Sequence, residues 1–154
     1  MNPPEWAPET VVDEALARHL LADQFPELSL AALRLLAEGW DNTVWLVNDE
    51  LVFRFPRRAI AIPGIEREIA ILPRLAARLP LAVPVPTFVG RRTDAFAWPF
   101  FGAPLVPGRE VADASLTDAA RAQLAPALGR FLRALHHPAL LDAALRQRGA
   151  RGGR

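Results

Sequence analysis

Three short apolar runs separated by two polar turns fill residues 32–55, and this pattern constrains the fold more than any other feature of the sequence. The first turn contains Gly39, the second covers residues 48–50, and Pro56 follows the third run and lacks a backbone donor. Runs rich in Val, Leu, Trp and Phe that are bounded by Gly, Asn and Asp indicate strands joined by tight connections. We therefore predict an antiparallel meander in this region.

The first turn is a candidate anion-binding loop because it contains Gly39. Glycine has no side chain, so the backbone N–H groups beside it can approach a phosphate closely. Most glycine turns only reverse the chain, and the turn alone supports both interpretations.

Arg54 lies between Phe53 and Phe55 in the third run. Side chains alternate across a strand, so Arg54 is predicted on the face opposite the two rings. A cation would then be held on one side of the sheet. The alternative is an ordinary solvated strand residue.

A helix is predicted after this strand, because Ile65, Ile69 and Leu72 form one stripe at helical spacing. Glu68 adjoins the stripe and can turn inward to meet Arg54. The alternative is that Glu68 forms a surface ion pair with a residue three or four positions away on the same helix, which contributes only about 0.2–0.5 kcal/mol to helix stability.

The flanking segments add further elements. Pro8 and the apolar spacing after it predict an opening helix over residues 9–24. Extended runs predict strands at 87–90 and 95–101, and prolines with glycines at 102–108 predict a bend.

A last helix is predicted beyond the bend. Ser115 with Asp118 resembles a capping box at its start, and Pro126 is expected to kink or break it. By the same reasoning, Pro73 is expected to end the Glu68 helix early. The apolar stripe of the last helix consists of Leu124, Leu128, Phe131, Leu132 and Leu135.

Three strings of this sequence resemble the N-terminal lobe of the aminoglycoside phosphotransferase family, to which macrolide phosphotransferases and related small-molecule kinases are similar. They are Glu-Gly-Trp-Asp-Asn-Thr-Val-Trp-Leu-Val at 38–47, Val-Phe-Arg-Phe-Pro-Arg at 52–57 and Arg-Glu-Ile-Ala-Ile-Leu at 67–72. The resemblance implies an α+β fold: a protein-kinase-like N-lobe with a five-stranded antiparallel sheet and one packed helix, a hinge, and a helical start of the C-lobe.

The resemblance also implies a nucleotide site for ATP. Arg54 stands where the family usually carries the strand lysine that contacts the α/β-phosphates, and Glu68 stands where the helix glutamate orients that cation. The implied contacts to the nucleotide are Gly39, Asn42, Val44, Val52, Arg54, Glu68, Pro104 and Val106. Val44 and Val52 would roof the adenine, although ordinary sheet core explains them equally well. The Pro104 carbonyl would accept from the adenine amino group and the Val106 amide would donate to the ring.

Arg54 departs from the family pattern, because arginine and lysine are not interchangeable. Its planar fork can still hold a carboxylate and a phosphate together. The chain contains no lysine at all, so a GC-rich coding bias is an alternative cause of this arginine.

The expected domain order runs from a helical extension to a tail. It is an N-terminal helical extension at 1–28, an N-lobe at 29–102, a hinge at 103–110, a truncated C-lobe helix at 111–145 and a disordered tail at 146–154. No His-Gly-Asp or Asp-Phe-Gly string occurs, so we expect the nucleotide-binding portion of a kinase, truncated before the catalytic loop and without activity of its own.

The full-length family would phosphorylate a small-molecule hydroxyl of an aminoglycoside or macrolide, and Mg²⁺ is expected only with the missing lobe. An alternative is an inactive remnant that acts as a binding or assembly module through its exposed terminal helix. Self-association through this helix is one form of that alternative. His136 and His137 adjoin each other, and adjacent residues on a helix point apart, so neither is taken as a base or metal ligand.

Composition narrows the remaining classes. The chain has no cysteine, which excludes disulfides and thiolate chemistry, and no apolar run of about 18 residues, which predicts no membrane span. A net charge of +1 gives no reason to expect a nucleic-acid partner. With no leader-like N-terminus, the cytoplasm is the expected location.

Overall fold

The computed structural model describes Pro4 and residues 7–140, and the chain forms two compact units. The first unit comprises the residues up to Ala70 together with Pro84–Leu105. The second comprises Ile71–Val83 and the residues from Val106 onward. The sheet and its core therefore belong to the first unit.

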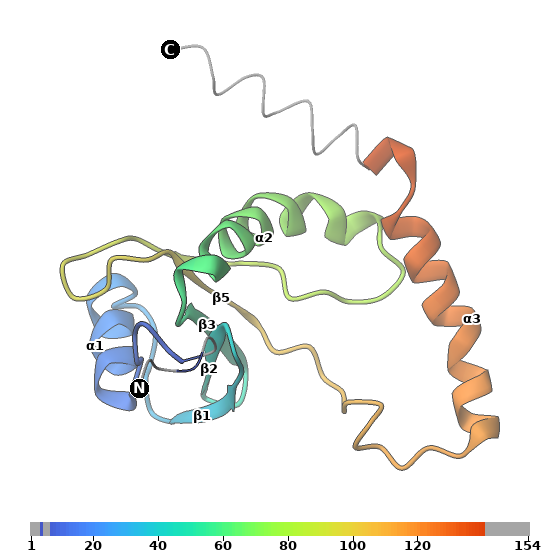
Figure 1. The fold of residues 1–154 in the computed structure, drawn as a ribbon, viewed down its shortest axis with the longest axis horizontal. Helices are drawn as coiled ribbons and strands as arrows, with labels where there is room; N and C mark the ends of the chain where they lie inside the picture. The colour runs from blue at the N-terminus through green and yellow to red at the C-terminus, as the bar shows by residue number, and fades with distance from the viewer. Residues whose placement is uncertain (1–3, 5–6, 141–154) are drawn as a thin grey trace. The chain divides into compact units, whose positions relative to one another are not determined.

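A five-stranded antiparallel sheet forms the centre of the first unit, in the order β1-β2-β3-β5-β4 (Figure 1). Its strands are β1 (Leu33–Glu38), β2 (Asn42–Val47), β3 (Leu51–Pro56), β4 (Phe88–Gly90) and β5 (Phe100–Pro104). The first three strands are consecutive neighbours, which is the predicted meander. The predicted α+β class with five strands is confirmed.

The turn between β2 and β3 sets the register of this meander. Asn48 and Asp49 both take left-handed backbone, with φ of 51° and 57°, a conformation that Asn and Asp tolerate better than most residues. The Glu50 N–H closes the turn on the Val47 carbonyl at 3.1 Å. The Asn48 side chain also accepts from the Ala32 N–H at 2.9 Å, which ties the turn to the entry of β1.

One face of the sheet carries the aromatic core, which α1 (Glu14–Gln24) covers. Leu20 and Leu21 of α1 are buried in the same cluster as the rings of Phe53, Phe55 and Phe100. The Phe55 and Phe100 rings stack with centroids 4.6 Å apart. Burial of such side chains is the main stabilising term of a small domain.

The predicted start of the first helix at Glu9 is wrong. The helix begins at Glu14 because the Asp13 side chain accepts from the Leu16 N–H at 2.8 Å and caps it. Pro8 therefore lies before the helix and does not begin it.

The opposite face of the sheet meets the first turns of α2 (Ile62–Leu75), which follows the short 3-10 turn η1 (Ala59–Ala61). Ile65, at 1% exposed, packs with Phe101 and Ala103 of β5, and Val52 and Ile69 border the cluster. Figure 1 shows α1 and α2 on different sides of the strands.

The expected early end of α2 at Pro73 is wrong, because the helix continues to Leu75 and a 3-10 turn, η2 (Ala76–Arg78), follows. Pro73 stands in the last turn. Proline has no N–H, so the intrahelical bond to the Ile69 carbonyl is lost at this position. The loss is tolerated because the helix ends two residues later, at Leu75.

The strand expected at 95–101 is shifted to Phe100–Pro104. Residues 93–96 instead form a turn in which Thr93 and Phe96 exchange backbone hydrogen bonds of 2.9 and 3.2 Å. Phe96, at 2% exposed, is buried in the aromatic core from this turn. Apolar content was therefore a sign of burial here and not of a strand.

The second unit contains α3 (Asp118–Leu135). Thr117, not the predicted Ser115, caps this helix by accepting from the Ala120 N–H at 3.2 Å. Ser115 has a φ of 46° and precedes the cap. The helix runs through Pro126 without a break, so of the expected kink or break at that residue the break is wrong and the kink stays a prediction.

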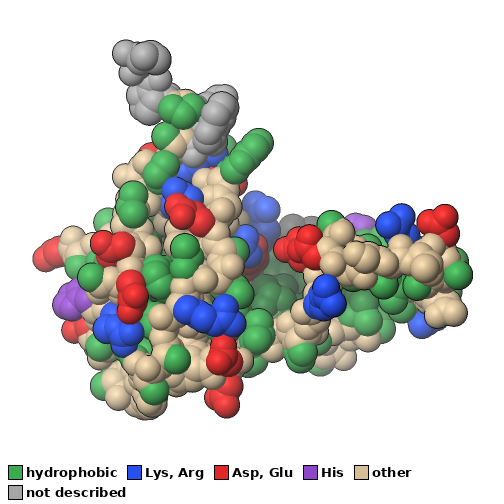
Figure 2. Space-filling view, turned by 90° about the horizontal axis from the view of Figure 1, so that it is seen from below, with side chains coloured by type: hydrophobic (Ala, Val, Ile, Leu, Met, Phe, Trp, Pro, Cys, Tyr) green, Lys and Arg blue, Asp and Glu red, His purple; other side chains and the backbone are tan. Residues whose placement is uncertain are grey.

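Residues 141–145 of the predicted C-lobe helix and the predicted tail at 146–154 lie outside the described part of the chain. No helix among residues 7–140 combines the length and apolar character needed to cross a membrane. On the face drawn in Figure 2, acidic and basic side chains are interspersed, in keeping with the net charge of +1.

Candidate functional site

Arg54 and Glu68 meet on the α2 side of the sheet. Arg54 Nη1 donates to Glu68 Oε2 at 2.7 Å, and the two side chains are 36% and 31% exposed. A charge-assisted bond of this length is among the stronger hydrogen bonds, but solvent screens a pair that is one-third exposed. The strand cation and helix carboxylate that the sequence singled out are thus in direct contact.

Val44 and Val52 share this face with Arg54. Val44 is the cross-strand partner of Arg54, and Phe101 is its partner on the other side. Both valines are half-buried, and Val52 borders the cluster of Ile65 and Phe101. Val52 therefore packs partly into the sheet core, and each valine keeps some exposed surface.

The end of β5 presents a carbonyl at the edge of the sheet. The Leu105 N–H donates to the Glu50 carbonyl at 2.7 Å, so it points toward β3. The Gly102 carbonyl accepts from the Thr87 N–H at 2.9 Å on the other edge. Because backbone directions alternate along a strand, the Pro104 carbonyl points away from β3, as the Gly102 carbonyl does.

The backbone N–H groups of Leu105 and Val106, the two donors near this bend, therefore differ. Leu105 already has an acceptor, and among the predicted contacts Val106 is the remaining donor. Val106 is 38% exposed and belongs to the second unit.

The turn between β1 and β2 is closed by its own backbone. The Gly39 N–H donates to the Asn42 carbonyl at 2.9 Å, and a Cβ at Gly39 would meet nothing nearer than that carbonyl at 3.8 Å. Gly39 does not take a positive φ. Its conformation therefore leaves room for a side chain, and the turn itself does not require glycine.

Asn42 contributes an unusual polar atom to this region. Its Oδ1 is buried and accepts no hydrogen bond from the residues that the structure describes. Leaving such an acceptor unsatisfied costs about 1–3 kcal/mol. The atom is enclosed, so it offers no open surface to a ligand in this conformation.

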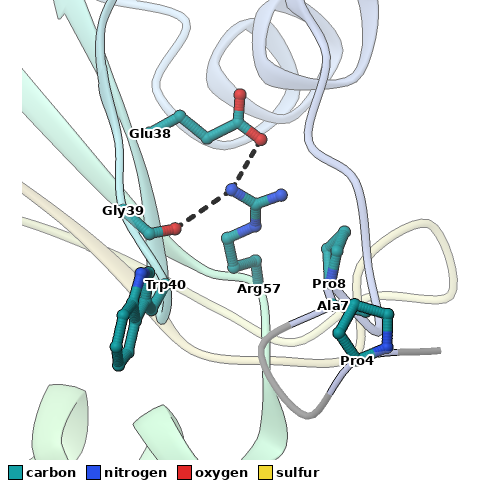
Figure 3. Close-up of a pocket in the computed structure, with 7 residues that line it drawn as sticks. All are labelled: Pro4, Ala7, Pro8, Glu38, Gly39, Trp40 and Arg57. Carbon is teal, nitrogen blue, oxygen red and sulfur yellow. Dashed lines mark hydrogen bonds and ion pairs between the residues drawn. The ribbon is translucent and has the colours of Figure 1, made fainter.

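Arg57 and Arg58, which sequence reasoning did not select, hold the same turn. Arg57 Nη1 contacts Glu38 Oε1 at 2.5 Å and the Gly39 carbonyl at 3.0 Å (Figure 3). Arg58 Nη1 donates to Asp41 Oδ1 at 3.1 Å. The signal was the Pro-Arg-Arg string at the end of β3, since the pairing of Asn42 with Pro56 places these arginines beside the turn.

A cavity of about 390 Å³ lies beside the turn, between it and the N-terminal segment. Its lining consists of Pro4, Ala7, Pro8, Glu38, Gly39, Trp40 and Arg57. Neither Arg54 nor Glu68 borders it. We therefore place the candidate site on the sheet face with the ion pair and not in this cavity.

Comparison with protein families assigns this chain to a known group. A model of the phosphotransferase enzyme family matches residues 32–153, and the chain belongs to that family. A comparison with the curated proteins found no match.

Solved structures of phosphotransferases are similar over most of this chain. The GDP complex of wild-type aminoglycoside 2'-phosphotransferase-IIIa is 29% identical with a TM-score of 0.76, over 86% of this chain and 46% of that one. The GDP and kanamycin complex of APH(2")-IIia is 30% identical with a TM-score of 0.73, over 83% and 44%.

A macrolide enzyme gives a further match. The apoenzyme of macrolide 2'-phosphotransferase MphH from Brachybacterium faecium is 26% identical with a TM-score of 0.57, over 90% of this chain and 54% of that one. The chain thus spans about half the length of these structures. The resemblance drawn from the sequence strings is confirmed.

Proposed function

We propose that this chain binds ATP on the α2 side of its sheet, as the nucleotide-binding portion of a kinase that phosphorylates a small-molecule hydroxyl. The contact of Arg54 with Glu68 at 2.7 Å is the observation that carries the proposal. A cation oriented by a helix carboxylate is the device by which kinases hold the α/β-phosphates. The similar structures that contain GDP support a nucleotide ligand.

Arg54 has the donors for this task. Its bond to Glu68 uses Nη1, and a guanidinium carries further N–H groups on Nε and Nη2 in the same plane. Arginine forms bidentate contacts with phosphate through such a fork. In our proposal Glu68 holds one arm of the guanidinium while the other donates to phosphate oxygens.

In our proposal the adenine ring of ATP binds at the end of β5. The Pro104 carbonyl accepts from the adenine amino group. Val44 and Val52 cover the ring with apolar surface. Gly39 and Asn42 are assigned to the phosphates, to which the Asn42 side chain can donate through Nδ2.

The acceptor alcohol and Mg²⁺ receive no residues of this chain in the proposal. Among the described residues no group of three or more His, Asp or Glu side chains lies close enough to hold a metal ion. An aminoglycoside or a macrolide is the proposed acceptor class for the whole enzyme, because the similar structures include one with kanamycin and a macrolide phosphotransferase. Phosphorylating such a compound would give antibiotic resistance, and the cytoplasm supplies the ATP.

Thermal unfolding with and without nucleotide tests the proposal. We expect millimolar Mg-ATP or a non-hydrolysable analogue to raise the Tm of the chain, since a ligand that binds only the folded state stabilises it. Arg54→Ala should abolish this shift. Arg34→Ala, which removes another exposed strand arginine with a 3.1 Å carboxylate contact to Asp49, should leave it intact. A wild-type Tm that does not respond to nucleotide would refute the proposal.

A second role, assembly through α3, is favoured by one observation. Leu124, Leu128 and Leu132 lie on one stripe of the helix and are 47%, 52% and 43% exposed. Apolar side chains in such a row mark interaction surfaces. In this alternative the chain associates with itself through these leucines.

A further inference from the structure

We propose that Arg57 is a positioning residue, which fixes the turn at residues 39–41 in the shape that meets the nucleotide phosphates. The inference rests on the proposed function, because it concerns the same nucleotide. The string at 52–57 contains Arg57, but the resemblance gave a role only to Arg54 in that string. Its contacts with three separate segments of the first unit carry the argument.

The side chain of Arg57 holds the start of the turn. Nη1 lies 2.5 Å from Glu38 Oε1 and 3.0 Å from the Gly39 carbonyl. The Arg57 side chain is only 12% exposed, whereas Glu38 is 46% exposed. Solvent therefore competes weakly for this guanidinium, and the ion pair is less screened than the surface pairs of the molecule.

The backbone of Arg57 holds the end of the turn and the N-terminal segment. Its N–H donates to the Asp41 carbonyl at 2.8 Å. Its carbonyl accepts from the N–H groups of Glu9 at 2.8 Å and Thr10 at 3.1 Å. Arg57 thus connects the turn to the segment that leads into α1.

Arg58 adds a second anchor to the same turn. Its Nη1 donates to Asp41 Oδ1 at 3.1 Å, and its side chain is 17% exposed. The Gly39 N–H is bonded to the Asn42 carbonyl at 2.9 Å. Both ends of the turn are therefore held by hydrogen bonds before any ligand arrives. A loop ordered in advance loses less conformational entropy when a ligand binds.

The contacts also determine which substitutions are informative. Arg57 Nε is buried and has no hydrogen-bond partner within the described chain, so the anchoring depends on Nη1 and the positive charge. Lysine can supply one charged donor, although it lacks the planar fork. Methionine keeps a long apolar stem and removes the donor and the charge. Arg57→Lys should therefore restore what Arg57→Met removes.

The test measures the turn and the ligand separately. Hydrogen exchange without nucleotide reports the Gly39 amide, and calorimetric titration compares ATP with adenosine, which has no phosphate. For Arg57→Met we expect faster exchange at Gly39 and about tenfold weaker ATP binding, with adenosine binding within about twofold of wild type. Arg57→Lys should return ATP affinity to within about threefold. Arg34→Met, on a strand of the same hairpin, should change neither quantity.

Several results would overturn the inference. Unchanged exchange at Gly39 in Arg57→Met would show that the side chain does not order the turn. Equal losses of ATP and adenosine affinity would indicate general damage. Should Arg57→Met fail to fold, Glu38→Gln removes the same ion pair from its more exposed partner, and it must then loosen the Gly39 amide. A wild-type chain that binds no nucleotide refutes the proposed function and the role toward phosphate, and exchange alone then decides whether Arg57 orders the turn.

Discussion

Arg54 of β3 and Glu68 of α2 lie 2.7 Å apart, from Nη1 to Oε2, with each side chain about one-third exposed at 36% and 31%. Pairs with this exposure contribute under about 1 kcal/mol to folding stability. The contact is therefore more important for orienting the guanidinium than for holding the fold together. Nucleotide affinity should respond to these residues more strongly than stability does.

Removing the charge of Glu68 tests this distinction. We expect Glu68→Gln to weaken ATP binding by about tenfold, because the amide can still accept from Arg54 but no longer holds it by charge. The matched control is Glu66→Gln, which breaks an exposed pair with Arg92 at 2.8 Å on the same helix. Isothermal titration should separate the two variants, and equal affinities would contradict the orienting role.

The same pair predicts a small effect on stability. Arg54→Ala should lower the free energy of unfolding by no more than about 1 kcal/mol, since the side chain is partly solvated. Urea unfolding followed by fluorescence of the buried Trp45 measures this value. A loss above about 3 kcal/mol would instead identify a buried structural ion pair.

Gly102 should be intolerant of any side chain. A Cβ there would lie 2.3–2.8 Å from ring atoms of Phe53, its cross-strand partner, and the ring cannot withdraw from a packed core. We expect Gly102→Ala to destabilise the chain by about 1–3 kcal/mol in urea unfolding.

Gly64 provides the control for this substitution. A Cβ at Gly64 meets nothing within 4 Å, and the residue lies in α2. Gly64→Ala should therefore leave stability unchanged or raise it by up to about 1 kcal/mol. If both alanines had the same effect, the close approach of Gly102 to Phe53 would not be the cause.

The leucine stripe of α3 predicts the behaviour of the chain in solution. Under the assembly hypothesis, sedimentation of the wild type should show an oligomer, and Leu128→Asp with Leu132→Asp should give a monomer, because a buried unpaired charge is strongly unfavourable. The control pair Ala122→Asp and Arg133→Asp lies on the opposite side of the helix. A monomeric wild type would refute assembly through α3.

The face of Arg54 could be predicted because it depends only on alternation along one strand. Phe53 and Phe55 are fully buried and mark the core face, so the residue between them had to point the other way. The inward direction of its partner Glu68 could be predicted from the helical spacing of the apolar residues that begins at Ile65. These assignments needed local pattern alone.

The anchors of the turn could not be predicted in this way. Arg57 and Arg58 reach Glu38 and Asp41 only because β1, β2 and β3 pair in one particular register, and the sequence string does not show which acidic residue an arginine will meet. The start of α1 was missed for a related reason. Pro8 and Asp13 are both typical of a helix N-terminus, and only the Asp13 side chain makes the capping bond.

The left-handed residues Asn48 and Asp49 lie at the end of β2 and β3 that is remote from Gly39. A slip of one residue in the pairing of these strands would turn every side chain of β3 to the other side, and Arg54 would then be forced among the phenylalanine rings. Two residues that contact neither Arg54 nor Glu68 therefore decide on which surface of the protein the guanidinium is displayed. A substitution at Asn48 or Asp49 could therefore remove the Arg54 guanidinium from the candidate site without changing Arg54 or Glu68.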